Sequence, residues 1–185
     1  EEASAIGNIL LEVEEGKKSR NRIIVVPGAN MAIRPEDVEF LREEIGKYDM
    51  VLLQLEIPMA INELVAGLAH EKGVPVMLNS APYAPLPEEL LRHVTYLSPN
   101  EHEAASLTGI PIRSGKDGVN REDVTAAVKA LQEKGVKNVI ITLGSNGAVV
   151  SNGEESHYMP CVDIVQVKDP PAAGDSFAGP FCTAV

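Results

Sequence analysis

Short apolar runs alternate with longer segments in which apolar residues recur every three or four positions. Apolar runs of this kind, bounded by polar turns, are typical of strands that are buried on both faces of a sheet. The longer segments have the period of amphipathic helices. The sequence therefore predicts strands over 49–55, 74–78, 94–97 and 139–143, and helices that begin at Pro35 and that span 61–73, 87–93, 100–108 and 124–135.

Strands that alternate with helices of this length form βαβ units and a mostly parallel sheet. The pattern of apolar and polar residues differs at the beginning of the chain. There the apolar runs 6–13 and 23–26 flank a polar turn and predict a β-hairpin. Later in the chain, short strands over 148–150, 156–159 and 164–167 are separated only by turns, and we expect them to lie antiparallel at one edge of the sheet. The predicted fold class is therefore α/β, with a small hairpin at its start.

Ligands bind to open sheets of this kind at the carboxyl ends of the strands. This rule selects the polar residues that follow the predicted strands, before any other evidence is considered. They are 54–56, 79–80, 98–100 and 142–144.

Composition limits the classes of partner. The chain has 185 residues, 44% of them hydrophobic, which is enough for one domain with a sizeable core. Its net charge of -11 argues against a nucleic-acid or anionic-membrane surface, because both need clustered Lys and Arg. No apolar run approaches the roughly 20 residues of a membrane span. We therefore expect neither nucleic acid nor membrane among its partners. Cys161 and Cys182 are too few for a disulfide framework and predict free thiols in the cytoplasm.

The segment 169–177 contains the strongest candidate for chemistry. The small residues Ala172, Ala173 and Gly174 precede Asp175 at what we expect to be the start of a helix. Unpaired N–H groups and the helix dipole at such a start favour an anion, and small side chains let a phosphate approach. Asp175 could then take the proton from an attacking hydroxyl group. The alternative is that Asp175 only caps the helix, a position where Asp is favoured.

This segment resembles the second signature of the ribokinase-like carbohydrate kinases, in which an Asp-Thr-x-Gly/Ala-Ala-Gly-Asp run supplies an anion hole and the catalytic base. Other segments match the family in the same order along the chain. They are Val-Pro-Gly-Ala-Asn at 26–30, Leu-Gln-Leu-Glu at 53–56, Leu-Ser-Pro-Asn-Glu-His-Glu at 97–103 and Ile-Thr-Leu-Gly-Ser-Asn-Gly at 141–147. The resemblance implies a three-layer αβα sandwich with a mostly parallel sheet. It assigns 1–28 to part of a small β-lid and 29–185 to a nucleotide- and sugar-binding domain that is incomplete at both ends.

The resemblance also implies roles for individual residues. Asp175 would be the base toward the primary hydroxyl of a sugar, and Glu56 would contact the same sugar. Ala172, Ala173 and Gly174 would form the anion hole for the transferring γ-phosphoryl group.

Asn100 and Glu103 match the Asn-x-x-Glu element that holds Mg²⁺ in this family, largely through water. The same spacing is that of a capping pair, with Asn at the N-cap and Glu three residues later. Both interpretations can hold together. The resemblance further assigns nucleotide contacts to Asn100, Gly174 and a loop of Thr142, Leu143, Gly144, Ser145, Asn146 and Gly147. The alternative for this loop is an ordinary turn between strands.

Potassium would be bound by the carboxylate of Asp169 and the carbonyl of Pro171, which match the cation loop of the family. The chain departs from the family here, because Pro170 and Pro171 fix φ and remove two N–H donors. Pro180 lies inside the expected helix, where a kink could displace Asp175. The sequence lacks two elements with which the family binds its sugar, Asn-x-Asp and Gly-Gly-Lys-Gly-Ala-Asn.

The function that the resemblance implies is phosphorylation of D-ribose at its primary hydroxyl, giving D-ribose 5-phosphate. ATP would be the co-substrate, Mg²⁺ the cofactor and K⁺ an activator, in a cytoplasmic homodimer formed through the β-lid. Two alternatives stay open: a related sugar or nucleoside kinase of the same family, and a non-catalytic nucleotide-binding fragment.

Overall fold

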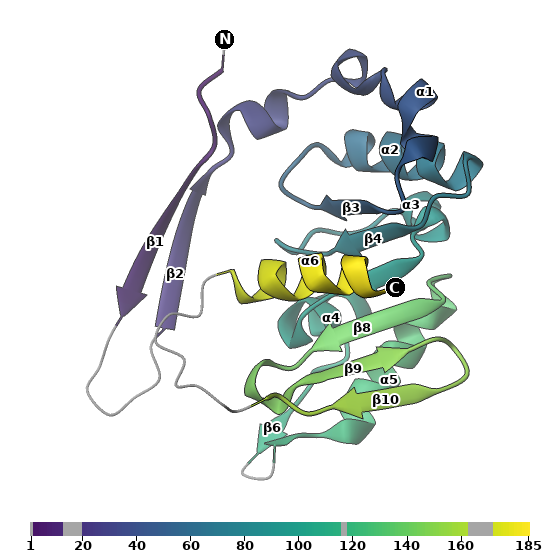
Figure 1. Cartoon of the computed structure of the whole chain (residues 1–185). Coiled ribbons are helices and arrows are strands. Elements are labelled where there is room, and N and C mark those ends of the chain that lie inside the picture. Colours follow the sequence, from purple (N-terminus) through teal and green to yellow (C-terminus); the bar gives the residue numbers. More distant parts are fainter. Residues whose placement is uncertain (1, 13–19, 116–117, 163–171) are drawn as a thin grey trace.

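The computed structural model describes residues 2–12, 20–115, 118–162 and 172–185, and its centre is a six-stranded sheet (Figure 1). The strands are β3 (Val51–Gln54), β4 (Val76–Asn79), β5 (Tyr96–Ser98), β8 (Asn138–Thr142), β9 (Ala148–Ser151) and β10 (Ser156–Met159). Their order in space is β10-β9-β8-β5-β4-β3.

The strand directions are those expected from the sequence. β3, β4, β5 and β8 run parallel, whereas β9 is antiparallel to both β8 and β10. This arrangement confirms the mostly parallel sheet and its antiparallel edge. The strand predicted over 164–167 lies outside the described residues.

Helices cover both faces of this sheet. Behind it in Figure 1 lie α2 (Met59–Glu71), α3 (Glu88–His93), α4 (Glu101–Thr108) and α5 (Arg121–Glu133), and in front of it lies α6 (Ala173–Ala184). The three layers confirm the predicted αβα sandwich. Among the helices of the described ranges, none is long and apolar enough to cross a lipid bilayer.

The two helix layers contact alternate residues of the strands, because successive side chains of a strand point to opposite faces. In β4, Val76 and Leu78 are fully buried in the large core that the sheet forms with α2 to α5. Met77 lies between them and faces the other way. Together with Ile140 of β8, it packs against Ala178 of α6. The continuous apolar run of a doubly covered strand thus supplies two separate cores.

The helix predicted to begin at Pro35 is only partly present. The chain forms a 3₁₀ turn (Pro35–Val38), one turn of α-helix, α1 (Leu41–Glu44), and a second 3₁₀ turn (Ile45–Lys47). Of these residues only Ile45 is fully buried. Val38 and Leu41 are only partly buried against the core. A helix gains most of its stability from packing its apolar face, so this limited burial does little to hold the segment as one continuous helix.

The loop that precedes α5 contains a small antiparallel hairpin, β6 (Ser114–Gly115) and β7 (Gly118–Val119), which the sequence did not predict. An ion pair fixes the start of this hairpin to α5. The Arg113 guanidinium donates to Asp123 Oδ1 at 2.6 Å and Oδ2 at 2.7 Å, and the Arg113 backbone N–H donates to Oδ2 at 3.0 Å.

The predicted hairpin at the beginning of the chain is present as β1 (Ile6–Glu12) and β2 (Arg20–Val26), which pair antiparallel. It forms a two-stranded sheet of its own that stands beside the α/β body (Figure 1). Many of its apolar side chains are exposed, namely Ile6, Ile9, Leu10, Ile23, Ile24, Val25 and Val26. Its assignment as a lid, separate from 29–185, stays a prediction.

Candidate functional site

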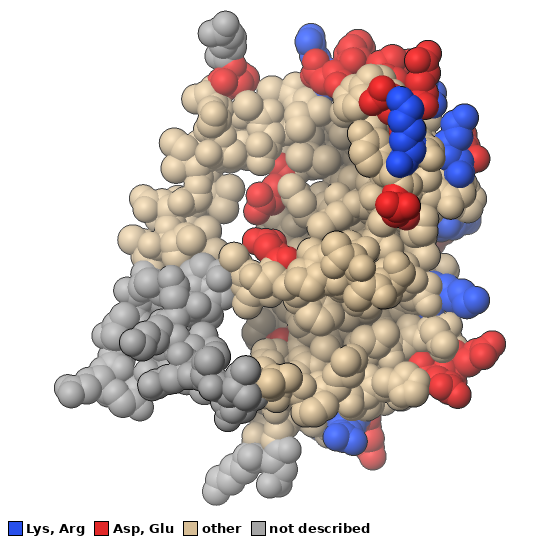
Figure 2. Space-filling view, in the orientation of Figure 1, with Lys and Arg blue, Asp and Glu red and all other residues tan. Residues whose placement is uncertain are grey.

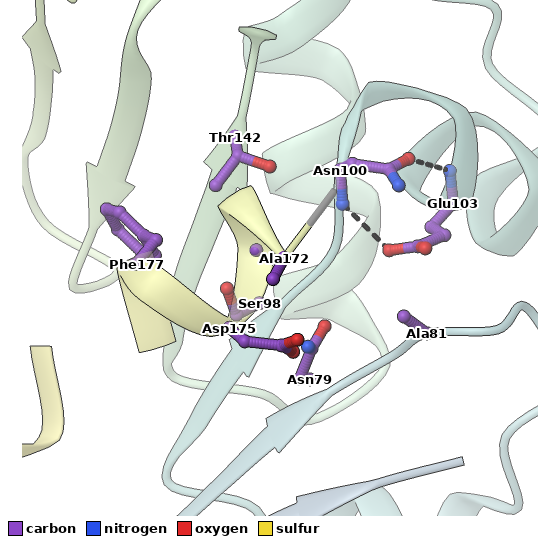
Figure 3. A pocket seen from close by; sticks show the side chains of 10 residues that line it. Asn79, Ala81, Ser98, Asn100, Glu103, Thr142, Ala172, Asp175 and Phe177 are labelled. Carbon is purple, nitrogen blue, oxygen red and sulfur yellow. Dashed lines mark hydrogen bonds between the residues drawn. The ribbon is translucent and has the colours of Figure 1, made fainter. Parts of the chain in front are cut away.

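A pocket of about 170 Å³ lies where β4, β5 and β8 end and where α6 begins (Figure 3). This is the edge of the sheet that the strand-end rule selects. Its lining residues are Asn79, Ala81, Ser98, Asn100, Glu103, Thr142, Ala172, Gly174, Asp175 and Phe177.

Strand pairing brings these residues together from distant parts of the sequence. Asn79 and Ser98 are paired in the register of β4 with β5. Asn100 and Thr142 form a parallel bridge, and the Thr142 N–H donates to the Pro99 carbonyl at 3.1 Å. The polar ends of three neighbouring strands therefore meet in one place.

Asp175 lies in the first turn of α6 and its side chain is exposed at the pocket (Figure 3). Ala172 precedes the helix in a left-handed conformation, with φ of 59°, and its carbonyl accepts the first helical hydrogen bond, from Ser176 N–H at 2.9 Å. Ala172 and Gly174 line the pocket together with Asp175, whereas Ala173 does not. A helix start with small residues and a carboxylate thus faces the ends of the parallel strands.

Pro180 does not end α6, which continues from Ala173 to Ala184. Packing against the sheet holds the helix in place. The Phe181 ring meets Tyr96 of β5 edge to face at 5.3 Å and stacks on Phe177 at 6.1 Å. Asp175 accordingly reaches the pocket, and the displacement considered from the sequence does not occur.

Asn100 and Glu103 form the capping box that their spacing allows. Asn100 Oδ1 accepts from the backbone N–H groups of His102 and Glu103, and Glu103 Oε2 accepts from Asn100 N–H, each at 2.9 Å. Both side chains also line the pocket. Burial raises the pKa of the Glu103 carboxyl above its ordinary value, although its hydrogen bonds with Asn100 oppose this. The pair therefore caps α4 and also lines the pocket.

The donor set of the pocket suits Mg²⁺, which prefers oxygen ligands and keeps several waters. Carboxylate, amide and hydroxyl oxygens come from Glu103, Asp175, Asn100 and Thr142. Within the described residues, no group of three His, Cys, Asp or Glu side chains could hold a metal ion on its own. A bound Mg²⁺ would therefore depend on water and on the phosphates of a substrate.

The predicted nucleotide loop reaches this pocket only through Thr142. Leu143 is buried, so only its backbone could meet a ligand. Gly144 to Asn146 form a 3₁₀ turn, which also contains Ser145. Gly147 has φ of 90°, and a Cβ there would collide with the Met159 carbonyl oxygen of β10. The close packing of this turn against β10 is therefore enough to explain why residue 147 is a glycine, and no bound ligand is needed to account for it.

The remaining candidates lie elsewhere. Glu56 is exposed two residues beyond β3 and does not line the pocket, and its backbone N–H donates to the side-chain oxygen of Gln54. Asp169 and Pro171, assigned to potassium, lie outside the described residues. Asn79, Ser98 and Phe177 line the pocket without having been given a role from the sequence. The strand-end rule did select Asn79 and Ser98, whereas only the packing of α6 reveals Phe177.

The charged residues that line the pocket are acidic in the part of the chain that the structure describes. They are Glu103 and Asp175, and no Lys or Arg is among the described lining side chains. Figure 2 shows acidic side chains beside the hollow between the hairpin and the α/β body. An anionic substrate would therefore meet backbone N–H groups, neutral donors and a bound cation rather than basic side chains.

Comparisons with known proteins agree with this geometry. The family model described as pfkB family carbohydrate kinase matches residues 5–185. A ribokinase from Schizosaccharomyces pombe is 36% identical over 187 residues, which cover 100% of this chain and 56% of that protein. A ribokinase from Haemophilus influenzae is 36% identical over 173 residues, which cover 94% of this chain and 54% of that protein.

The structure is similar to that of Arabidopsis thaliana ribokinase complexed with ribose and ATP. The TM-score is 0.78 at 35% sequence identity, and the match covers 96% of this chain and 55% of that chain. The chain therefore spans about half the length of the curated relatives it matches.

Proposed function

Because the chain belongs to the pfkB family of carbohydrate kinases, we propose that it serves the ATP-dependent phosphorylation of D-ribose at its primary hydroxyl, giving D-ribose 5-phosphate. The observation that carries this proposal is the position of Asp175, which lies in the first turn of α6 at the pocket where the parallel strands end. The ribokinases among its relatives favour ribose as the acceptor.

Asp175 acts as the general base in the proposed reaction. Its carboxylate takes the proton of the primary hydroxyl as the hydroxyl oxygen attacks the γ-phosphorus of ATP. The bond from that phosphorus to the bridging oxygen breaks, and ADP leaves. Backbone N–H groups at Ala172, Ala173 and Gly174 stabilise negative charge on the transferring group, because the start of a helix favours anions.

Mg²⁺ would be held by Asn100 and Glu103, largely through water, and would neutralise part of the phosphate charge. The oxygen-rich lining of the pocket supports this assignment, as does the lack of basic side chains among the lining residues that the structure describes. Potassium, the proposed activator, would be bound by Asp169 and Pro171.

The nucleotide would contact Asn100, Gly174 and the loop that follows β8. The position of Thr142 in the pocket and the exposure of Ser145 and Asn146 support this role. Glu56 would contact the sugar from the same edge of the sheet, since it follows β3 as Asn79 ends β4.

We place the protein in the cytoplasm, because Cys161 and Cys182 are free thiols. We further propose a homodimer formed through the β1–β2 hairpin, whose exposed apolar side chains support an interface.

Replacement of Asp175 by Asn tests the proposed function. We expect kcat for ribose phosphorylation to fall about 10²- to 10⁴-fold, because general-base catalysis contributes about that much. The KM for ATP should change little, since the amide has nearly the same shape as the carboxylate. ADP formation coupled to NADH oxidation measures both values. Turnover by Asp175→Asn equal to that of the wild type would remove Asp175 from the role of base.

A second candidate function is nucleotide binding without catalysis, which is favoured by the position of Glu56 outside the pocket. The same experiment separates the two functions when thermal melting is recorded beside ADP formation. Stabilisation by MgATP with no ADP formed from ribose, fructose or a nucleoside would support this candidate. Transfer to fructose or a nucleoside in preference to ribose would instead identify a related kinase of the family.

A further inference from the structure

Asn79 lines the pocket, but the proposed reaction has not yet assigned it a role. It is the last residue of β4, is half-buried, and is flanked in the sheet by Gln54 and Ser98. Figure 3 shows its amide group and the carboxylate of Asp175 pointing toward one another across the pocket. A residue at the end of an inner strand is held more rigidly than one in a loop.

Among the described residues, the Asp175 carboxylate has neither an ion pair nor a hydrogen bond, and none of those that line the pocket is Lys or Arg. An ionised carboxylate only accepts hydrogen bonds, and it has two oxygens. As a base it needs one oxygen directed at the substrate hydroxyl, so the second oxygen requires a donor from the protein.

The amide of Asn79 is suited to that task. It offers two N–H donors, and it is the labelled side chain toward which Asp175 points in Figure 3. The Asn100 side chain differs, because in Figure 3 it points toward Glu103 and the start of α4, where its oxygen accepts the capping hydrogen bonds, and not toward Asp175. Hydrogen bonds of a catalytic group are often long before a substrate is bound, so an approach without a closed bond is expected here.

We propose that Asn79 is a positioning residue for Asp175: its amide donates a hydrogen bond to one carboxylate oxygen and directs the other at the acceptor hydroxyl. This inference deepens the proposed function and rests on Asp175 being the base. The proton moves from the hydroxyl to the second oxygen of Asp175, and Asn79 neither gains nor loses a proton. A neutral donor serves here without adding a charge beside the phosphates.

Two substitutions separate this role from others. Asn79→Ala removes the donor, and we expect kcat to fall about 10- to 100-fold with both KM values nearly unchanged, since misplaced catalytic groups cost about that much. Asn79→Asp keeps the shape but repels Asp175, so its kcat should fall below that of Asn79→Ala. A higher kcat for Asn79→Asp than for Asn79→Ala, with less Mg²⁺ required, would show that residue 79 serves the metal and would overturn the proposal.

The control is Asn138→Ala, the same substitution at the first residue of β8. The pocket lies at the other end of that strand. Asn138 Nδ2 donates to the Thr95 carbonyl at 2.8 Å, far from the pocket lining, so the variant should lose stability while kcat stays unchanged. In an Asp175→Asn background, Asn79→Ala should cause no further loss of kcat, because residues that act as a unit are not additive. Full additivity would overturn the positioning role and leave the proposed function standing, whereas full activity of Asp175→Asn alone would remove Asp175 from the role of base and overturn both.

A measurement on the ¹⁵N-labelled 185-residue chain needs no turnover. The side-chain NH₂ signals of Asn79, assigned by their loss in Asn79→Ala, should move upfield in Asp175→Asn when MgATP and ribose are present. Those of Asn138 should stay in place. Identical Asn79 signals in the wild type and in Asp175→Asn would overturn the positioning role.

Discussion

At the scale of single residues, the start of α4 places one pair of side chains both in a helix cap and in the lining of the pocket. Asn100 and Glu103 close a capping box with hydrogen bonds of 2.9 Å, and both also line the pocket. Glu103 uses Oε2 for the cap. The structural interpretation and the proposed metal-binding role are therefore compatible, and a substitution can separate them.

Glu103→Gln should weaken Mg²⁺ binding and leave the helix intact. Gln replaces Glu in capping boxes, so the melting temperature should change little. Loss of the carboxylate should raise about 10- to 100-fold the Mg²⁺ concentration needed for ATP to stabilise the chain, as for other groups that hold a metal through water. Differential scanning fluorimetry with ATP and increasing Mg²⁺ measures this concentration.

The matched control is Asn120→Ala. Asn120 caps α5 with bonds of 2.9 Å and 3.2 Å but does not line the pocket. The substitution Asn120→Ala should lower the free energy of unfolding by about 1 kcal/mol and leave the Mg²⁺ requirement unchanged. An unchanged Mg²⁺ requirement in Glu103→Gln would leave Glu103 with a structural role only.

Residues also mark the limit of what the sequence could predict. The rule that ligands bind at the carboxyl ends of the strands selected the edge of the sheet at which the pocket lies, because the ends of the parallel strands meet there. It could not tell which side chains face the pocket. Asn79 lines it, whereas Glu56 lies outside, and this depends on how the chain turns after each strand. Phe177 could be recognised as a pocket residue only from the structure, because the packing of α6 against β5 places it there.

At the scale of elements, the sequence predicted the strands and long helices well because their patterns are set by burial. The runs 76–78 in β4 and 139–141 in β8 are apolar throughout, since helices cover both faces of the sheet. The prediction of a continuous helix over 35–47 was wrong, although Val38, Leu41 and Ile45 do pack on the core, because only Ile45 is fully buried and the residues between them are mostly exposed. The hairpin β6–β7 is too short to have a period.

The Arg113–Asp123 pair ties this hairpin to α5, and its strength should depend on pH. Hydrogen bonds from Arg113 lower the pKa of the Asp123 carboxyl from 3.8 to about 2. A lowered pKa in the folded state means that the charged pair stabilises the fold above pH 3.8 and that this contribution is lost as the pH falls through about 2.

Asp123→Asn should accordingly lower the melting temperature at neutral pH, and the difference from the wild type should shrink in acid. Thermal melting by circular dichroism between neutral and acidic pH measures this. Glu39→Gln is the control, because the Arg42–Glu39 pair is equally short at 2.6 Å but more than half exposed at both side chains. Exposed pairs contribute little, so this variant should melt like the wild type. If the difference in melting temperature between Asp123→Asn and the wild type did not change with pH, the charged pair would not be its cause.

At the scale of the whole molecule, the chain combines a well-packed α/β body with a hairpin that has little to pack against. Isolated two-stranded hairpins are marginally stable in water. In the register of β1 with β2, Ile9 lies opposite Ile23, and Ile6 lies opposite Val26. These side chains are 45% to 60% exposed, so the hairpin presents apolar surface on both of its faces. Such contiguous surface marks interaction sites on proteins.

We therefore predict that the 185-residue chain forms dimers through β1 and β2. Ile23→Lys and Ile24→Lys place a charge on opposite faces of the hairpin, and each side chain is more than half exposed, at 53% and 56%. Sedimentation equilibrium should show a dimer for the wild type and a shift toward monomer for the variant whose face forms the interface.

Phe40→Lys is the matched control for this prediction, because Phe40 is also 56% exposed but lies in the broken helical segment of the body. It should remain dimeric, and all variants should melt within a few degrees of the wild type, because none of the replaced side chains is buried. A monomeric wild type would remove the hairpin interface. A dimer that survives in both hairpin variants would move the interface elsewhere, with the exposed edge strand β3 and its Leu52 (46% exposed) as the next apolar surface to vary.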